Sequence, residues 1–185
     1  MEDLIISDGR PPDCTGPTEK EILTYALLDK LGIQFWRTDH GWMKADTMED
    51  CHVIDACLNA TVCKNLFLCN RQKTNFYLLM MPGDKPFKTK ELSHQLGIAR
   101  LSFASPEDME QYLDCTPGSS SIMGLANDAE NKVQLLMDED IKAGEYLGCH
   151  PCINTSSLKL RTADVLETFL PAVHHEPIFV HLTGE

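Results

Sequence analysis

The segment TPGSSSIMGL, at positions 116–125, has residue types that could support chemistry. It is too small and polar to belong to a core. Gly118, inside a run of hydroxyl residues, lets successive backbone N–H groups turn towards one point, and such a cradle binds a carbonyl or phosphate oxygen. A surface turn has the same composition. The choice between the two therefore depends on which residues accompany the loop.

Two other segments could bring side chains to such a cradle: CKNLFL at 63–68 and GCHPCIN at 148–154. Lys64 begins a short, mostly apolar strand, where a partly desolvated ammonium group can bind an oxygen or act as acid or base. His150 precedes a proline, which favours an extended backbone. Its ring could donate to an ester oxygen or position a water. The simpler interpretations are a surface lysine at a strand end and a histidine that caps its own loop.

Nucleophilic and metal chemistry fit the sequence less well. The serines at 119–121 lack the final glycine of a Gly-x-Ser-x-Gly elbow. Cys149 or Cys152 paired with His150 is another possibility, but such near neighbours rarely have the geometry for base activation. The cysteines at 51, 57, 63 and 69 and the pair at 149 and 152 match no zinc motif. We expect no metal and mostly free thiols.

Composition indicates an ordinary globular protein with uneven charge. The 185 residues are 43% hydrophobic, and the formal net charge is −12, which disfavours nucleic-acid binding over the whole surface. Residues 64–100 nevertheless hold seven basic side chains against two acidic ones, and residues 101–145 hold two against ten. One segment could therefore face a phosphate backbone, although ordinary solvated faces explain the counts equally well. With no membrane-length apolar run and no signal-peptide pattern, we expect a cytoplasmic protein without a membrane or DNA partner.

The elements that must position these residues alternate irregularly between helix and strand. Thr18 and Glu21 form a capping box for a helix that ends at Gly32, and Thr47 begins a second helix. Residues 65–69 and 75–81 predict a hairpin that turns at 70–74. Further strands are predicted at 33–37, 100–103, 132–137, 158–160 and 177–182, and further helices at 88–96, from 105, at 138–146 and at 162–170.

This order predicts one mixed α/β domain over residues 18–185, after an irregular lead-in at 1–17. The sequence contains neither GxGxxG nor GxxxxGK[ST], so neither a dinucleotide-binding fold nor a P-loop is supported. We expect His174 and His175 to be exposed in a polar turn.

The three segments and their order resemble one family. CKNLFL is similar to the family's TKNLFL strand, and LSFASPE at 101–107, TPGSSS at 116–121 and GLAND at 124–128 are similar to its LSFASPE, TPGSVS and GLIND segments. GCHPCINT at 148–155 resembles its GFHPNDNT turn. The family is the freestanding prolyl-tRNA editing proteins, the PrdX and ProXp-ala group of the YbaK/prolyl-tRNA-synthetase insertion-domain superfamily. The resemblance runs from about Thr18 to about Leu182.

The resemblance implies an α+β fold with a curved, partly barrel-like mixed sheet flanked by helices. It also implies hydrolysis of mischarged aminoacyl esters, most often alanine on proline tRNA, without metal or cofactor. The partner would be the acceptor end of tRNA(Pro), with prolyl-tRNA synthetase as a further candidate. In the family, the lysine lies in the active site, the loop amides hold the carbonyl, the histidine lines the pocket, and a ribose hydroxyl assists the attacking water.

We therefore expect Lys64, Gly118 and His150 to be catalytic. The expected substrate-binding residues are Asn65, Ser119, Ser120, Ser121, Ile122 and Asn154.

The sequence departs from the family at Ile122, where the loop should end in proline. Proline fixes its own φ and restrains the preceding residue. Isoleucine can adopt the same backbone without enforcing it, and its branched side chain could alter the amino-acid pocket. This departure favours a second hypothesis: a non-catalytic module of the same fold that binds aminoacyl-tRNA or a synthetase.

Overall fold

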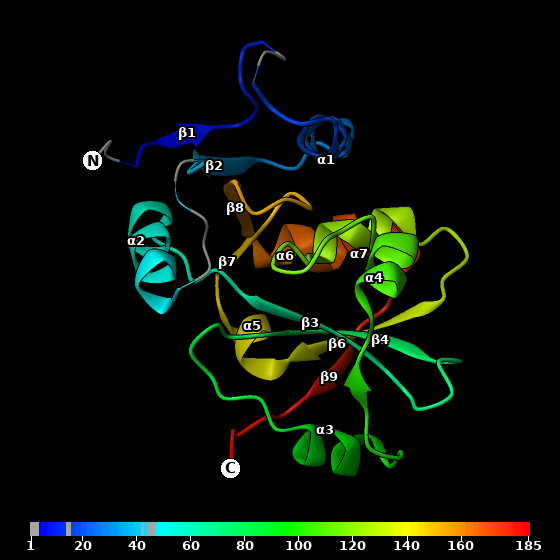
Figure 1. Ribbon diagram of the computed structural model, residues 1–185. Coiled ribbons are helices and arrows are strands. Elements are labelled where there is room, and N and C mark those ends of the chain that lie inside the picture. The colour runs from blue at the N-terminus through cyan, green and yellow to red at the C-terminus, as the bar shows by residue number, and fades with distance from the viewer. Residues whose placement is uncertain (1–3, 14–15, 42, 44–46) are drawn as a thin grey trace.

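The computed structural model describes residues 4–13, 16–41, 43 and 47–185. In this part of the chain the strands form two sheets (Figure 1). The upper sheet in that view is antiparallel, with the order β1-β2-β8-β7. Its strands are β1 (Ile6–Asp8), β2 (Phe35–Asp39), β8 (Ser156–Arg161) and β7 (Tyr146–Cys149).

The lower sheet is mixed and has the order β5-β3-β4-β6-β9. The predicted hairpin pairs β3 with β4, whereas β4, β6 and β9 run parallel to one another. These strands are β5 (Ser102–Phe103), β3 (Lys64–Cys69), β4 (Phe76–Met81), β6 (Val133–Asp138) and β9 (Ile178–Val180). The predicted mixed fold is thus confirmed, with its strands divided between two sheets.

The helices start at the residues that the capping signals indicate. Thr18 accepts from the Glu21 amide at the start of α1, and Ser105 and Asp108 form a second capping box at α4. Helix α2 flanks the left of the molecule in Figure 1, and α3 lies beneath the lower sheet. The helical elements are α1 (Glu19–Lys30), α2 (Met48–Leu58), α3 (Thr89–Leu96), α4 (Pro106–Leu113), η1 (Ile122–Asn127), α5 (Glu139–Ala143), α6 (Thr162–Asp164), η2 (Val165–Phe169) and α7 (Leu170–Ala172).

Strand β4 is buried on both faces and therefore contributes to two clusters of apolar side chains. Leu78 and Met80 belong to the main core, which also contains residues of the upper sheet such as Phe35 and Leu158. The alternating Leu79 and Met81 join a second cluster with side chains of α3. Successive strand residues point to opposite faces. The lower sheet thus packs against the upper sheet on one side and against α3 on the other.

The structure differs from the sequence predictions in several elements. Within the expected irregular lead-in, β1 pairs with β2 through the register Ser7 to Arg37. The helix expected at 138–146 is only α5, because β7 begins at Tyr146 and pairs with β8. His175 is buried rather than exposed, and its Nε2 lies 2.9 Å from an oxygen of Asp128.

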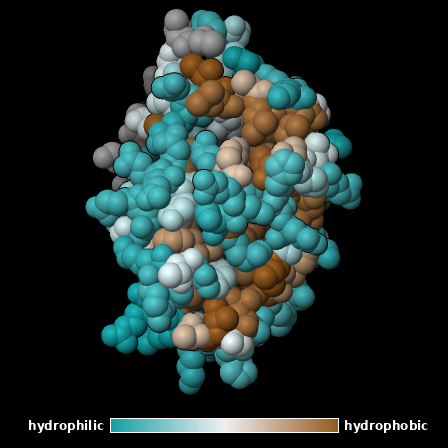
Figure 2. All heavy atoms as spheres, turned by 90° about the vertical axis from the view of Figure 1, so that its right-hand side faces the viewer, coloured by the Kyte–Doolittle hydropathy of each residue, from teal (hydrophilic) through white to brown (hydrophobic). Residues whose placement is uncertain are grey.

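Figure 2 shows the face that lies to the right in Figure 1, where polar and apolar side chains form a mosaic. None of the helices in the described ranges combines the length and the apolar character that crossing a membrane requires.

Candidate active site

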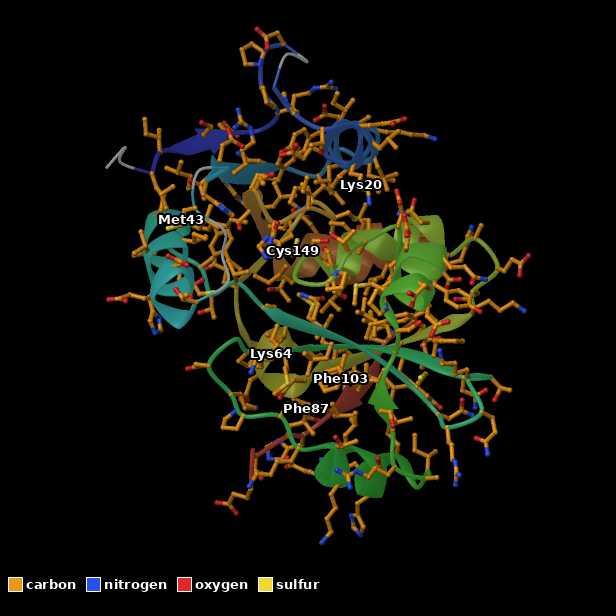
Figure 3. All side chains as sticks on the ribbon, viewed as in Figure 1. Lys20, Met43, Lys64, Phe87, Phe103 and Cys149 are labelled. Atoms are coloured by element: carbon orange, nitrogen blue, oxygen red, sulfur yellow. The ribbon has the colours of Figure 1, made fainter. Side chains whose placement is uncertain are left out.

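A cavity of about 710 Å³ opens between β3, α2, β5 and the start of α4. Lys64, Gly118 and His150, which come from three distant parts of the sequence, all line it. Asn65 and Ser120 line it as well. Figure 3 shows Lys64 at the start of β3, below the position of Cys149. The cavity thus brings together the three residues that we expected to be catalytic.

The approach of β3 and β7 explains how Lys64 and His150 come to the same cavity. Val62 and Gly148 form a parallel bridge, and each of the two residues lies two positions beyond it. The Cys63 amide donates to the Gly148 carbonyl at 2.8 Å, and the Gly148 amide donates to the Thr61 carbonyl at 3.0 Å. A Cβ atom at Gly148 would lie 2.8 Å from the Cα of Val62, so this approach requires glycine.

Lys64 is half-buried, and its ammonium is fixed by backbone. Its Nζ donates to the Lys85 carbonyl at 2.8 Å. The Lys85 ammonium is held in turn by Asp138, at 2.8 Å, and by the Leu182 carbonyl, at 2.7 Å. An ammonium group carries three hydrogens. Lys64 therefore keeps donors for a ligand in the cavity.

Two side chains of the cavity have buried polar atoms that lack a hydrogen-bond partner among the described residues: Oδ1 of Asn65 and Oγ of Ser120. The Asn65 amide nitrogen donates to the Cys63 carbonyl at 3.1 Å, which fixes the orientation of the side chain. Buried polar atoms without a partner are costly and mark sites where a ligand or water completes the bonding. Asn65 thus lies at the cavity beside Lys64, although a regular pleat would point the two side chains apart.

The loop before η1 is held by its hydroxyl groups. Gly118 has a φ of 86°, a conformation that favours glycine. The Ser119 side chain bonds the backbone of Thr116 at both its amide and its carbonyl. No hydrogen bond is formed by the amides of Gly118 and Ser120 within the described ranges, and both residues line the cavity.

Ser121 links this loop to the histidine turn. Its hydroxyl donates to the His150 carbonyl and accepts from the Met123 amide. Ser121 is completely buried. The loop and the backbone of His150 are therefore held together by a side chain that is itself removed from solvent.

The His150 ring is held at Nδ1, which lies 3.0 Å from the Ser156 carbonyl oxygen. A carbonyl can only accept, so Nδ1 carries the hydrogen and Nε2 keeps its lone pair in the neutral ring. Burial lowers the pKa of His150, and burial likewise lowers that of His40. Ser157 Oγ lies 3.3 Å from Nδ1 of His150 and 2.9 Å from Nε2 of His40. The two neutral imidazoles thus share a hydroxyl.

The structure places the remaining predicted residues away from the described lining of the cavity. The Ser119 side chain bonds Thr116 within the loop, and the Ser121 hydroxyl bonds the His150 carbonyl. Ile122 is fully buried in the main core, so its branched side chain fills the interior rather than the cavity. Asn154 lies in the turn between His150 and β8 and is half-buried. Asn65 and Ser120 are thus the two predicted substrate-binding residues that line the cavity.

The sequence interpretation missed residues that reach the cavity from other elements. Asp55 on α2 lines it, accepts from the Val62 amide at 2.8 Å, and has a pKa that burial raises. Phe103 on β5 lines it while 64% exposed. Phe103 lies in the LSFASPE motif, which could have indicated it. No sequence pattern beyond residue type indicates Asp55, or His40, which contacts Ser157 beside His150.

The cysteines of the histidine turn are buried and do not belong to the described lining of the cavity. Cys149 is fully buried, and burial raises its pKa, which disfavours the reactive thiolate. Cys152 is also buried and lies outside the described lining of the cavity. Within the described ranges, no three His, Cys, Asp or Glu side chains come together in a way that could hold a metal ion.

The chain belongs to the aminoacyl-tRNA editing domain family, whose model matches residues 43–168. The matched range contains all the predicted site residues. The prediction that the chain is an aminoacyl-tRNA deacylase, and the resemblance to prolyl-tRNA editing proteins, are confirmed.

Similar proteins carry related descriptions. The prolyl-tRNA editing protein ProX of Acetoanaerobium sticklandii is 29% identical over 140 residues, covering 76% of this chain and 84% of the relative. The prolyl-tRNA synthetase associated domain-containing protein 1 of Danio rerio is 30% identical over 156 residues, covering 83% of each chain. A solved structure described as a candidate trans-editing enzyme for prolyl-tRNA synthetase superposes with a TM-score of 0.66 at 10% identity, covering 91% of this chain and 100% of that one. At that identity the superposition supports the fold alone.

Proposed function

We propose that the protein hydrolyses mischarged tRNA(Pro) in trans, with Ala-tRNA(Pro) as its main substrate. The observation that carries this proposal is the arrangement around the cavity. Gly118 and Ser120, whose amides have no hydrogen-bond partner among the described residues, line the same cavity as Lys64 and His150. Such donors suit an ester carbonyl that gains negative charge. The descriptions of the relatives support proline tRNA as the carrier.

In the proposed reaction, water attacks the aminoacyl carbonyl carbon and forms a new C–O bond. The loop amides stabilise the oxyanion, and Lys64 adds positive charge beside it. The bond between the carbonyl carbon and the ribose oxygen then breaks. The proton that the water loses ends on that ribose oxygen, assisted by the neighbouring ribose hydroxyl and by Nε2 of His150, which orders the water. The products are a free amino acid and an intact tRNA.

The charges of the cavity suit the amino group of the substrate. Asp55 and Asp84 line the cavity, and the α-ammonium of an aminoacyl ester is positive. Opposite charges a few ångströms apart attract strongly when they are partly shielded from water. We infer that the part of the cavity lined by Asp55 and Asp84 holds the ammonium group, whereas the loop amides hold the carbonyl.

Editing of small amino acids has a clear physical purpose. A synthetase pocket built for proline rejects a smaller side chain by only about 1–3 kcal/mol. A separate hydrolase removes the residual error. Under this proposal the protein works in the cytoplasm, where charged tRNA is used, with prolyl-tRNA synthetase as a candidate partner.

The burial of Ile122 weakens the alternative of a non-catalytic module. That hypothesis depended on Ile122 changing the amino-acid pocket, and the side chain instead packs in the core. The catalytic proposal keeps Lys64 and His150 at the cavity.

Deacylation of tRNA(Pro) charged with alanine, cysteine or serine tests the proposal directly. We expect ester loss well above the buffer rate, fastest for alanine, and expect Lys64→Ala to abolish it because the oxyanion loses its positive neighbour. The measurement is the first-order loss of labelled amino acid from tRNA. Circular dichroism checks that Lys64→Ala remains folded.

Lys132→Ala is the matched control, because Lys132 is an exposed lysine that precedes β6 and is absent from the described lining of the cavity. It should retain full activity. If the wild-type protein binds charged tRNA yet hydrolyses no ester above the buffer rate, the enzyme proposal fails. Full activity in Lys64→Ala would remove Lys64 from the mechanism.

A further inference from the structure

Phe103 presents an aromatic ring to solvent at the cavity. It is 64% exposed, the second largest exposure among the described large apolar side chains, after Ile5 at 72%. It also lines the cavity that contains Lys64 and Gly118. A large exposed aromatic ring on the lining of a cavity is available for contact with a ligand there.

The ring and its backbone contact neighbouring elements. Phe103 pairs with Leu68 across the edge of the lower sheet, and the following amide, of Ala104, donates to the Phe67 carbonyl at 2.9 Å. The ring of Phe87 meets that of Phe103 edge-on, with centroids 6.1 Å apart and planes at 72°. Phe87 itself packs against the second core cluster. Figure 3 shows these two rings beneath β3, near Lys64.

We propose that Phe103 is a stacking platform for the 3′-terminal adenine of the substrate tRNA, a proposal that rests on the proposed function. The aminoacyl ester is bonded to the ribose of that adenosine. When the carbonyl lies among the donors of the cavity, the adenine must therefore lie within one nucleoside's reach of them. Phe103 is an exposed aromatic ring on the lining of that same cavity.

The chemistry of the platform suits a base of any tRNA. Aromatic side chains stack on bases through their π-faces, and each such contact contributes a factor of roughly 5 to 150 in affinity. Phenylalanine has only two side-chain torsions, so ordering its ring on binding costs little conformational entropy. Adenine is uncharged, so Asp55 and Asp84 in the cavity do not repel it. The exposed Lys88 and Arg100, near the two aromatic residues in sequence, are available to neighbouring phosphates.

Steady-state kinetics of Phe103→Ala and Phe103→Trp on Ala-tRNA(Pro) test the platform. We expect Phe103→Ala to lower kcat/KM roughly 5- to 150-fold, mainly through KM, and Phe103→Trp to stay within about threefold of wild type. With 3′-O-alanyl ribose, which keeps the neighbouring hydroxyl but has no base, the loss in Phe103→Ala should shrink to less than threefold. Ile178→Ala, which truncates another exposed apolar residue, is the control and should match wild type on both esters.

A direct binding measurement separates this proposal from the proposed function. tRNA(Pro) with 2-aminopurine as its terminal base should lose fluorescence on binding wild type and Phe103→Trp, and not on binding Phe103→Ala. If the wild-type protein hydrolyses no ester but shows this Phe103-dependent quenching, the platform stands and the deacylase proposal fails. The platform is overturned if Phe103→Ala binds and hydrolyses Ala-tRNA(Pro) like wild type. It is also overturned if kcat/KM of Phe103→Ala falls by the same factor on both esters. Unchanged kinetics with lost binding to prolyl-tRNA synthetase would overturn it in favour of a protein-docking surface.

Discussion

The His150 ring has one nitrogen committed to the protein and one left for chemistry. Nδ1 is bound to the Ser156 carbonyl, so Nε2 of the neutral ring can accept a proton from water. The shared Ser157 hydroxyl also restrains the ring, because it bonds His40 on its other side. A histidine held in this way needs no carboxylate partner to fix its tautomer.

Because burial lowers the pKa of His150, the neutral ring persists below the ordinary histidine value of about 6.5. We expect kcat/KM, corrected for buffer hydrolysis, to be nearly constant from about pH 7 to 8. It should fall about tenfold per pH unit on the acid side, beneath the lowered pKa, where protonation removes the lone pair of Nε2. Initial rates across a pH series measure this.

The His150→Gln variant is the control for that profile, because it should lose the acid-side decline together with most activity. An unchanged decline would assign the titration to another group.

The lowered pKa of His150 also means that the unfolded chain binds the proton more tightly than the folded protein. The contribution of this histidine to the free energy of unfolding is therefore fully present above about pH 6.5 and falls below it. Circular dichroism at each pH is therefore needed to separate loss of rate from loss of fold.

At the scale of elements, the site depends on the close approach of β3 and β7. Gly148 permits it, because a Cβ there would meet the Val62 Cα at 2.8 Å and the Thr61 carbonyl at 3.0 Å. Both contacts are with backbone, which cannot rotate away. The two strands carry Lys64 and His150 to the cavity, so a change in their spacing changes the distance between these residues.

We therefore expect Gly148→Ala to lower kcat/KM about 10- to 100-fold, because a displacement on the order of 1 Å costs that much in a positioned site. Overpacking should also reduce the free energy of unfolding by about 1–3 kcal/mol. Deacylation kinetics and urea unfolding measure the two effects.

Gly144→Ala is the matched comparison, since a Cβ at Gly144 would meet its nearest neighbour at an ordinary 3.4 Å. It should change neither quantity appreciably. Equal behaviour of the two variants would contradict the argument from close approach.

At the scale of the whole molecule, Asp128 connects segments that lie far apart in the sequence. Its carboxylate accepts from the Lys132 amide at 2.9 Å, from the Val133 amide at 2.8 Å and from His175 at 2.9 Å. It therefore ties the end of η1 to the start of β6 and to the turn before β9. Asp128 is 5% exposed.

We expect Asp128→Ala to lower the free energy of unfolding by about 3 kcal/mol or more, because it leaves buried donors without a partner. Asp128→Asn should lose less, since the amide oxygen still accepts. Urea denaturation of both variants provides the measurement, with Asp164→Ala as a half-exposed aspartate for comparison. A loss below about 1 kcal/mol in Asp128→Ala would contradict this role.

Much of this architecture could be predicted from local signals. The capping box at Thr18, the helix start at Ser105 and the turn between β3 and β4 depend on neighbouring residues, and they appear where predicted. Strand β7 was missed because its sequence, YLGC, is short and follows a helix without a clear stop. Its status as a strand comes from pairing with β8, which sequence reasoning on one segment does not capture.

For the candidate site, too, local patterns indicated some residues and tertiary contacts decided the others. Lys64, Gly118 and His150 could be singled out because each lies in a distinctive local pattern, and all three line one cavity, whereas their catalytic roles stay predictions. The roles of Ser121 and Ile122 could not, because a serine that bonds a distant carbonyl and an isoleucine that fills the core differ from pocket residues only through tertiary contacts. The boundary of the domain at residue 18 stays a prediction, and the deacylation assay with alanine, cysteine and serine determines the amino acid removed.

The bridge between Val62 and Gly148 has a consequence for how long the site stays assembled. The amide hydrogens of Cys63 and Gly148 span the seam between the two sheets. A fluctuation that separates the two sheets here breaks both hydrogen bonds. The same event separates β3, which carries Lys64, from the turn that carries His150. Such partial openings require less free energy than global unfolding. The exchange of these two amides with solvent deuterium would therefore time the disassembly of the site in the intact protein.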